Sequence, residues 1–460
     1  MKLIPKAHEE QLGLVLCATL AAVVFELAAT TSFRILDLLL VVLSAVLALT
    51  LLENTRDGVW RMVQGLAQRF GGAVPLLVPF LLAAYVLYDL ANIINSPAAS
   101  LATAKYKVVV LMLVISLCLL VYIKTAARLR VVLLTIGVTT GVVALITIVN
   151  YLFSGPFPIF YTMRLTLRKD YNVFATTLLL GYLCVAYLFA SSPHTAKKCV
   201  LFALHSAVTL TVLYLSGSRR VFLMLPLILI FWLAVILFQE KNWRSLATVM
   251  LSAVAAFAVF LCVTYAMQGY MHRQYEVFGG YGFGQEGSGE KGEGTPAERY
   301  ETVEEGNMLA KRKVIWGIAW EEYKSYSLTQ KLFGKGFGYD IILYDNTQND
   351  ELAKEYSHLE GEKGLLSAHN FLLADLLNGG MVKALLGVLL LLALLWSCLQ
   401  LLLRSFAAAA FYANVLLVVV LGSFISNRHG LLYDKFFYIF ALLLLLQLGF
   451  EQRLKRGLEE

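Results

Sequence analysis

The stretch VVLLTIGVTTGVVALITIVNYLF, residues 131–153, contains no charged residue and is long enough for a helix to cross about 30 Å of hydrocarbon. Similar runs recur along a chain of 460 residues that is 59% hydrophobic and only 15% charged, which is too apolar for a soluble protein. The sequence therefore predicts an all-α polytopic membrane protein of about twelve transmembrane helices. We expect the spans near 12–31, 34–52, 73–94, 107–124, 131–153, 173–191, 199–216, 221–238, 245–267, 381–403, 407–426 and 433–449.

Lysine and arginine residues gather in four of the connections between these runs and near both termini. By the positive-inside rule, these connections and both termini are expected in the cytoplasm. The net charge of +7 is then a topology signal, and we read no nucleic-acid binding from it. The four connections are 53–72, 124–130, 192–198 and 239–244.

One long polar segment, from about 268 to 380, separates the ninth and tenth expected spans. We therefore expect three parts: 1–267 with transmembrane helices 1–9, 268–380 as a large, partly helical extracytoplasmic loop domain, and 381–460 with helices 10–12 and a cytoplasmic tail. The loop begins with a Gly- and Glu-rich piece, residues 279–306, whose composition predicts no core of its own.

Two helices are expected in the rest of the loop. The first covers about 307–326 and carries one face with three-and-four spacing, and the run LFGKGFGYD, residues 332–340, then interrupts the helical pattern. The second starts near His369 and ends at Gly379 and Gly380, directly before the tenth span. The residues on the shared face of the first helix are Arg312, Ile315, Trp316, Ala319 and Tyr323.

Several cations break the positive-inside rule, because they lie in short connections on the expected outer face. Such cations suit a site for a phosphorylated lipid, since guanidinium groups pair with phosphate oxygens at two points. Snorkelling to headgroup phosphates explains any one of them equally well, but less well the adjacent Arg219 and Arg220. The residues are Arg164, Arg168, Lys169, Arg219, Arg220, Arg428 and His429.

His369 lies in LLSAHNFLLADLLNGG, residues 365–380, and is expected near the outer membrane interface. An imidazole exchanges protons near neutral pH, so a histidine at the mouth of an apolar cavity is a candidate general base. By its spacing alone, a structural role for His369 is the commoner alternative.

Several short motifs resemble those of the O-antigen ligase and O-antigen polymerase superfamily, and four of them occur in that family's order. SGSRRVFL at 216–223 and SAHNFLLADLLNGG at 367–380 resemble that family's arginine and histidine signatures. KRKVIWGIAW at 311–320 and LFGKGFG at 332–338 resemble its Arg-x-x-x-Trp helix and Gly-x-Gly turn, and RKDYNVFAT at 168–176 resembles its asparagine motif.

The resemblance implies a glycosyltransferase whose donor is an undecaprenyl-pyrophosphate-linked glycan and whose acceptor is a glycan, lipid or wall hydroxyl. It makes His369 the catalytic base and makes Arg219 and Arg312, with Arg220, binders of the pyrophosphate. Asn172, Trp316 and Asn370 become supporting residues. It implies inversion at the anomeric carbon and neither a metal ion nor a cofactor, in agreement with the lack of an Asp-x-Asp pair in the outer connections.

Other functions stay open at this point. A ligase and a polymerase of the same superfamily share the donor and differ in the acceptor, and the Arg and His motifs favour the ligase. A polysaccharide flippase or transporter usually carries charges deep in its spans, where this sequence offers only a few candidates, Glu26, Asp89 and His205. The sequence also contains no internal repeat of the kind found in many transporters. A structural scaffold subunit is a third possibility.

Overall fold

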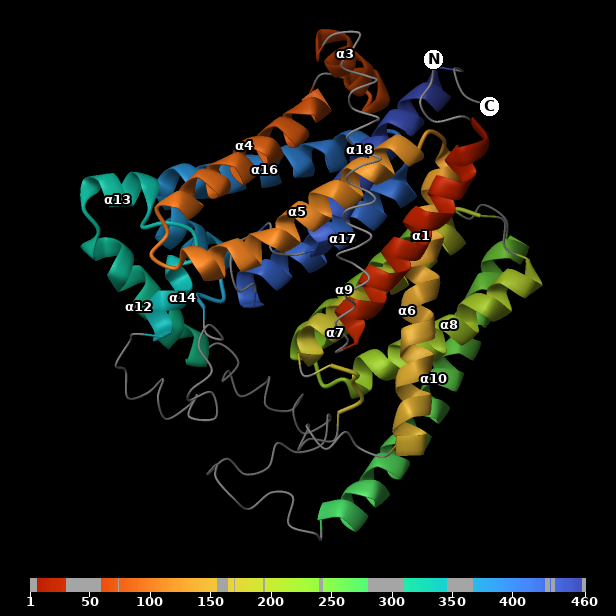
Figure 1. Cartoon of the computed structure of the whole chain (residues 1–460). Helices are drawn as coiled ribbons and strands as arrows, with labels where there is room; N and C mark the ends of the chain where they lie inside the picture. The colour runs from red at the N-terminus through yellow and green to blue at the C-terminus, as the bar shows by residue number, and fades with distance from the viewer. Residues whose placement is uncertain are drawn as a thin grey trace.

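The structure is a computed structural model of the whole chain, and every regular element in its described part is a helix (Figure 1). The residues that it describes are 6–29, 59–72, 74–154, 164–168, 170–192, 195–239, 243–279, 310–345, 367–426, 431 and 435–456. The expected all-α fold class is therefore confirmed for this part of the chain.

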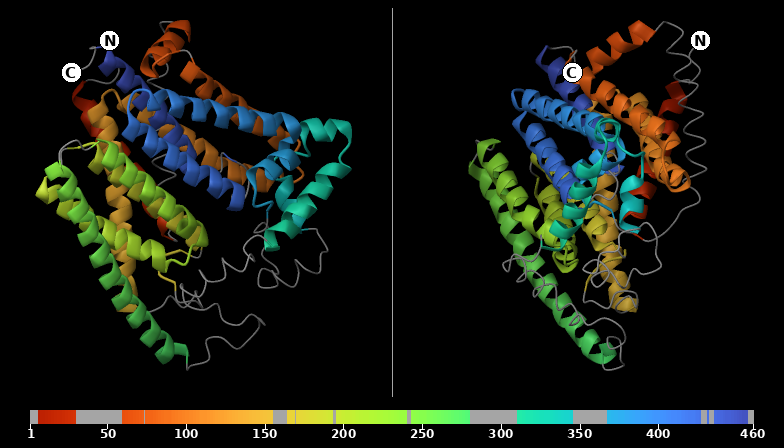
Figure 2. Two further views of the ribbon diagram at one scale, coloured as in Figure 1. Left: turned by 180° about the vertical axis from the view of Figure 1, so that it is seen from behind. Right: turned by 90° about the vertical axis from the view of Figure 1, so that its left-hand side faces the viewer.

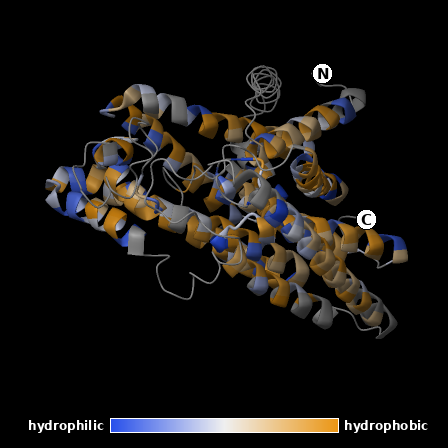
Figure 3. Cartoon of the chain, turned by 90° about the horizontal axis from the view of Figure 1, so that it is seen from below, coloured by the Kyte–Doolittle hydropathy of each residue, from blue (hydrophilic) through white to orange (hydrophobic). Residues whose placement is uncertain are grey.

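Eight of the described helices are long and apolar enough to cross a membrane, and apolar residues dominate their ribbons (Figure 3). They are α4 (Leu77–Ile94), α6 (Ala126–Ser154), α7 (Tyr171–Ala190), α8 (Ala196–Leu215), α10 (Trp243–Gly279), α16 (Phe371–Leu402), α17 (Phe406–Ser426) and α18 (Lys435–Lys455). The chain is thus a multi-pass membrane protein.

Three further helices coincide with expected spans, although they are not among the eight. These are α1 (Lys6–Ala28), α5 (Ala99–Tyr122) and α9 (Arg219–Gln239); α1 and α5 contain shorter apolar segments, Gly13–Ala28 and Tyr106–Tyr122. The expected span at 34–52 lies outside the described residues. The number twelve therefore stays a prediction.

One expected boundary differs from the structure and another is confirmed. Helix α10 continues to Gly279, past the expected end of the ninth span at 267, because a helix need not stop where its hydrophobic run stops. Helix α16 is interrupted at Gly380, where the sequence predicted that the loop helix ends and the tenth span follows.

The remaining helices are short. At the end of the bundle opposite both termini, α12 (Ala310–Ser325), α13 (Leu328–Phe333) and α14 (Tyr339–Asp345) gather around the start of α16 (Figures 1 and 2). Helix α3 (Val59–Arg69) and the 3-10 turn η1 (Val74–Leu76) precede α4. The termini and α12–α14 thus lie at opposite ends of the bundle (Figure 1).

Candidate functional site

Helix α16 is broken close to its beginning. Asn370 caps its N-terminus, and its side-chain oxygen accepts hydrogen bonds from the amides of Leu372 at 2.9 Å and Leu373 at 3.2 Å. At Gly380, φ is 65° and ψ is −164°, angles that only glycine adopts readily. The break interrupts the helical hydrogen-bond ladder, so the carbonyls of the preceding turn need donors from elsewhere.

Those donors come from residues 332–338 and from two tyrosines. The segment LFGKGFG lies against the broken turn, residues 377–380, and we call this pair of segments the glycine clasp. Its main-chain amides replace the lost helical bonds, so the Gly-x-Gly turn works as a C-cap supplied by a distant part of the chain. The bonds are Lys335 N to Leu377 O at 3.1 Å, Gly336 N to Asn378 O at 3.0 Å, Tyr326 OH to Leu377 O at 3.1 Å and Tyr88 OH to Gly379 O at 2.8 Å.

The glycines of the clasp are required by close main-chain contact. A Cβ atom at Gly334 would overlap the carbonyl of Asn378, and one at Gly380 would overlap the main chain of Leu332. Both glycines also have positive φ, 75° and 65°. The glycine-rich break predicted from the sequence is therefore a docking element for α16.

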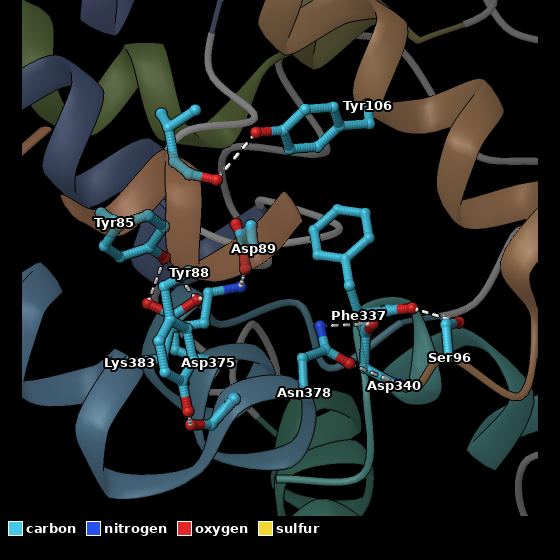
Figure 4. Close-up of polar contacts among 12 residues, drawn as sticks. Tyr85, Tyr88, Asp89, Ser96, Tyr106, Phe337, Asp340, Asp375, Asn378 and Lys383 are labelled. Carbon is cyan, nitrogen blue, oxygen red and sulfur yellow. Dashed lines mark hydrogen bonds and ion pairs between the residues drawn. The ribbon is translucent and has the colours of Figure 1, made fainter. Parts of the chain in front are cut away.

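A buried charge network lies beside the clasp (Figure 4). Lys383 Nζ, which is fully buried, lies 2.6 Å from Asp89 Oδ1 on α4 and 3.3 Å from Asp375 Oδ1 on the first segment of α16. The Tyr85 hydroxyl donates to the Asp375 carboxylate, 2.5 Å from each oxygen. The ring of Phe337, from the clasp, is 5.1 Å from the ammonium. Lys383 thus joins α4, both segments of α16 and the clasp.

A second buried pair fixes α14. Asn378 Nδ2 donates to Asp340 Oδ1 at 2.9 Å, and the Asp340 amide donates back to Asn378 Oδ1 at 3.0 Å. At the other side of the clasp, the Ser96 hydroxyl donates to the carbonyl of Phe337 at 2.6 Å. The clasp is therefore held between the α4–α5 corner and α16.

Helix α12 packs on the start of α16 through the face that its three-and-four spacing defined. Ile315, Ala319 and Tyr323 are buried in one cluster with Ala368, the neighbour of His369. Trp316 packs against the same cluster, and its buried indole N–H has no acceptor among the described residues. Arg312 lies one turn before Trp316 on the same helix. The helix that carries Arg312 is therefore docked directly on the segment that carries His369.

His369 has an unusual main-chain conformation. Its φ is 47°, the only positive value of a non-glycine residue in the described part of the chain. A left-handed residue of this kind is strained, and such strain often occurs at functional sites. The side chain is partly exposed, directly before the Asn370 cap of α16.

The second group of predicted residues surrounds the turn at 216–220, which we call the arginine turn. Asn172, in the first turn of α7, accepts a hydrogen bond at 2.9 Å from the hydroxyl of Ser218. The Leu165 amide donates to the Leu215 carbonyl at 2.9 Å, and the Arg164 guanidinium lies 4.0 Å from the ring centre of Tyr171. The motif of Asn172 and the arginine turn are thus in direct contact.

Arg219 and Arg220 open α9 from this turn. Arg219 is partly exposed, whereas Arg220 is buried and its Nη1 would lie 3.6 Å from a Cβ atom at Gly422 of α17. Two residues further along α17, Phe424 packs edge-on against Phe371, with ring centres 4.8 Å apart. The end of α17 therefore connects the arginine turn with the segment of His369.

Not every predicted cation belongs to this group. Arg168 donates to the carbonyls of Leu27 at 3.0 Å and Glu26 at 3.3 Å, so it caps the end of α1. Lys169, Arg428 and His429 lie outside the described residues. Across the described ranges, no group of three or more His, Cys, Asp or Glu side chains could hold a metal ion.

Sequence reasoning missed the polar groups that hold the clasp. Glu322 Oε1 accepts from Lys335 Nζ and from the Tyr339 hydroxyl, both at 2.6 Å. Burial raises the pKa of Glu322, but these two hydrogen bonds and the Lys335 charge outweigh it and leave that pKa below its usual value. Asp375 and Lys383 could have been found from the sequence, because they are opposite charges that flank Gly379–Gly380 in an apolar run.

The comparisons with known proteins concern most of these residues. No curated protein matches the chain. Residues 204–386, however, match a family model described as O-antigen ligase, and this range contains the arginine turn, α12, the clasp and His369. Residues 204–386 therefore match an O-antigen ligase domain, in agreement with the resemblance that the sequence motifs indicated.

Proposed function

We propose that this protein transfers a glycan from an undecaprenyl-pyrophosphate carrier to an acceptor hydroxyl, on the extracytoplasmic face of a bacterial cytoplasmic membrane. Its O-antigen ligase domain implies a membrane enzyme that transfers glycosyl groups. In this proposal His369 is the general base, Arg219 and Arg312 bind the pyrophosphate with Arg220, and the loop domain is catalytic.

The arrangement around His369 is the observation that carries the proposal. His369 has a strained conformation at the point where α12, which bears Arg312, docks on α16. The Phe371–Phe424 contact links the same segment to α17, whose Gly422 lies beside Arg220. A candidate base and candidate anion-binding groups therefore belong to one continuous packing unit.

The proposed reaction needs both kinds of group. His369 takes the proton of the acceptor hydroxyl while that oxygen attacks the anomeric carbon. The bond from this carbon to the pyrophosphate oxygen breaks, and its electron pair leaves with the pyrophosphate. Fixed guanidinium groups stabilise the charge that develops on the leaving group, as a divalent cation would in another transferase. Attack opposite the leaving group inverts the anomeric configuration.

The supporting residues receive narrower roles in this proposal. Asn370 fixes the start of α16 by capping it, and Asn172 holds the arginine turn through Ser218. Trp316 packs α12 on α16, and its buried indole N–H has no acceptor among the described residues. We propose that all three position His369 and the arginines.

Two other functions compete with a ligase. A polymerase of the same superfamily would use the same donor and another glycan as acceptor. A flippase or transporter is favoured by one observation, the membrane-buried Asp89, Asp375 and Lys383. These three charges pair with one another and with Tyr85, however, which suits a structural lock better than a path for a substrate.

Purified protein in liposomes distinguishes these functions. With a lipid-linked glycan donor and a defined acceptor, we expect a new glycosidic bond of inverted configuration, detected by NMR, and unchanged rates in EDTA. Joining of donor repeat units without a separate acceptor would indicate a polymerase. Movement of the donor across the bilayer with no covalent change would overturn the transferase proposal.

A further inference from the structure

Helix α13 carries large apolar side chains that the described part of the protein leaves exposed. None of its residues, Leu328–Phe333, is buried. Leu328 is 77% exposed, Leu332 38% and Phe333 51%. Half of the side chains of this short helix are thus large, apolar and accessible, which in a water-exposed loop would be unfavourable.

Main-chain contacts, not these side chains, hold α13 in place. Ser327 and Gln330 form a capping box at its start, and the Tyr323 hydroxyl donates to the Lys331 carbonyl at 3.3 Å. Its last residues lie against Gly380 in the glycine clasp. The position of α13 is therefore fixed without contacts made by its apolar side chains.

The neighbours of α13 are surfaces of helices that cross the membrane. Just beyond Gly380, Met381 is 55% exposed and Leu385 58% exposed on α16. On α4, the Tyr88 hydroxyl lies 3.4 Å from the Phe333 carbonyl. Both α16 and α4 are candidate membrane spans, and most residues of their apolar segments are not buried in the protein. The apolar side chains of α13 continue this lipid-facing surface at the end where the loop domain begins.

We propose that α13 lies in the membrane interface and inserts Leu328, Leu332 and Phe333 among the acyl chains of the adjacent leaflet. Amphipathic helices bind membranes in this way, with the helix axis in the plane of the interface. Trp320 on α12 is 44% exposed, with Lys324 Nζ 5.8 Å from its ring centre, and such aromatic and cationic side chains prefer the headgroup region. The loop domain would then be anchored to the lipid surface and not only tethered by α10 and α16.

This anchoring goes beyond the proposed transfer reaction and is tested without it. Single nitroxide labels are placed at 328, 332 and 333 in the full chain in liposomes, with the exposed Cys262 and the partly exposed Cys17 replaced by serine. Collision rates are measured with oxygen, which concentrates in the bilayer, and with a water-soluble nickel chelate. Matched labels at Thr329 and Ser325, which are exposed polar positions, serve as controls.

We expect labels at 328, 332 and 333 to collide severalfold more with oxygen than with the chelate, and the controls to show the reverse. Access of the chelate to all five labels would place α13 in water and overturn the proposal. Protection from both reagents would mean that a protein surface, such as a second copy of the chain, covers α13, which also overturns it.

Discussion

The glycine clasp and the arginine turn lie in the same stretch, residues 204–386, that matches the O-antigen ligase family, but they are built in opposite ways. In the clasp, main chain meets main chain, and its key contacts exclude any side chain at Gly334 and Gly380. In the arginine turn, a short backbone segment presents long side chains, held by Ser218 and Asn172. The comparison separates a region that fixes geometry from a region that offers charge.

Of the changes that disturb the geometry around the glycine clasp, loss of Lys383 should have the largest effect. Lys383→Met leaves Asp89 and Asp375 buried without their cation, a change that typically costs about 3–5 kcal/mol. We expect a large fall in Tm in detergent, measured on purified protein. The triple variant Asp89→Asn, Asp375→Asn, Lys383→Met removes all three charges and should regain much of the loss. Equal Tm values for Lys383→Met and wild type would show that the network does not hold α16.

Loss of an arginine that we propose to bind the pyrophosphate should affect charge and not geometry. Arg219→Ala and Arg312→Ala should each lower the transfer rate by about a hundredfold, with little change in Tm, because an oriented donor to the transition state is lost. Lysine at either position should restore only part of the rate, since an ammonium cannot make the planar two-point contact. Arg168→Ala is the matched control. Because the Arg168 guanidinium caps α1, this variant should lower Tm more than it lowers the transfer rate. Full activity of both lysine variants would show that these residues act only as general positive charges and not as oriented ligands of the pyrophosphate.

A methyl group in the clasp should have a clear but smaller effect on stability. Gly380→Ala introduces strain of about 1–3 kcal/mol and an overlap with Leu332, so Tm should fall. Gly317→Ala is the matched control, because a Cβ atom at Gly317 in α12 meets nothing within 4 Å and alanine favours a helix. The Tm difference between the two variants measures the clasp. No difference would mean that the close approach at Gly380 is not needed.

The smallest expected effect is a pH dependence at Glu322. Because its folded-state pKa is lowered, its contribution to stability is present above the unfolded pKa and is lost as the pH falls through the lowered folded-state pKa. The pair with Lys335 is partly exposed, so the effect should not exceed about 1 kcal/mol. Tm measured between about pH 6 and 3 should fall less in Glu322→Gln than in wild type. Parallel pH profiles would exclude this contribution.

Much of the helical architecture could be predicted because hydrophobic runs and helical periodicity are local signals. The buried face of α12 and the break at Gly379–Gly380 followed directly from spacing and composition. The Lys383 network could not, since Asp89 and Lys383 meet only when α4 packs on α16. For the same reason, sequence alone grouped Arg168 with the anion-binding cations, although tertiary structure places it on the carbonyls of α1.

The central claim is that His369 activates the acceptor, and the most direct test separates donor binding from transfer in His369→Ala. We predict unchanged affinity for the lipid-linked donor and a transfer rate lower by about a hundred- to ten-thousandfold, the usual contribution of a general base. In the wild type, the rate should fall once His369 is protonated at acid pH. His358 lies outside the described residues, and His358→Ala should leave the transfer rate nearly unchanged. Normal transfer by His369→Ala, or an equal loss of donor binding, would contradict the account.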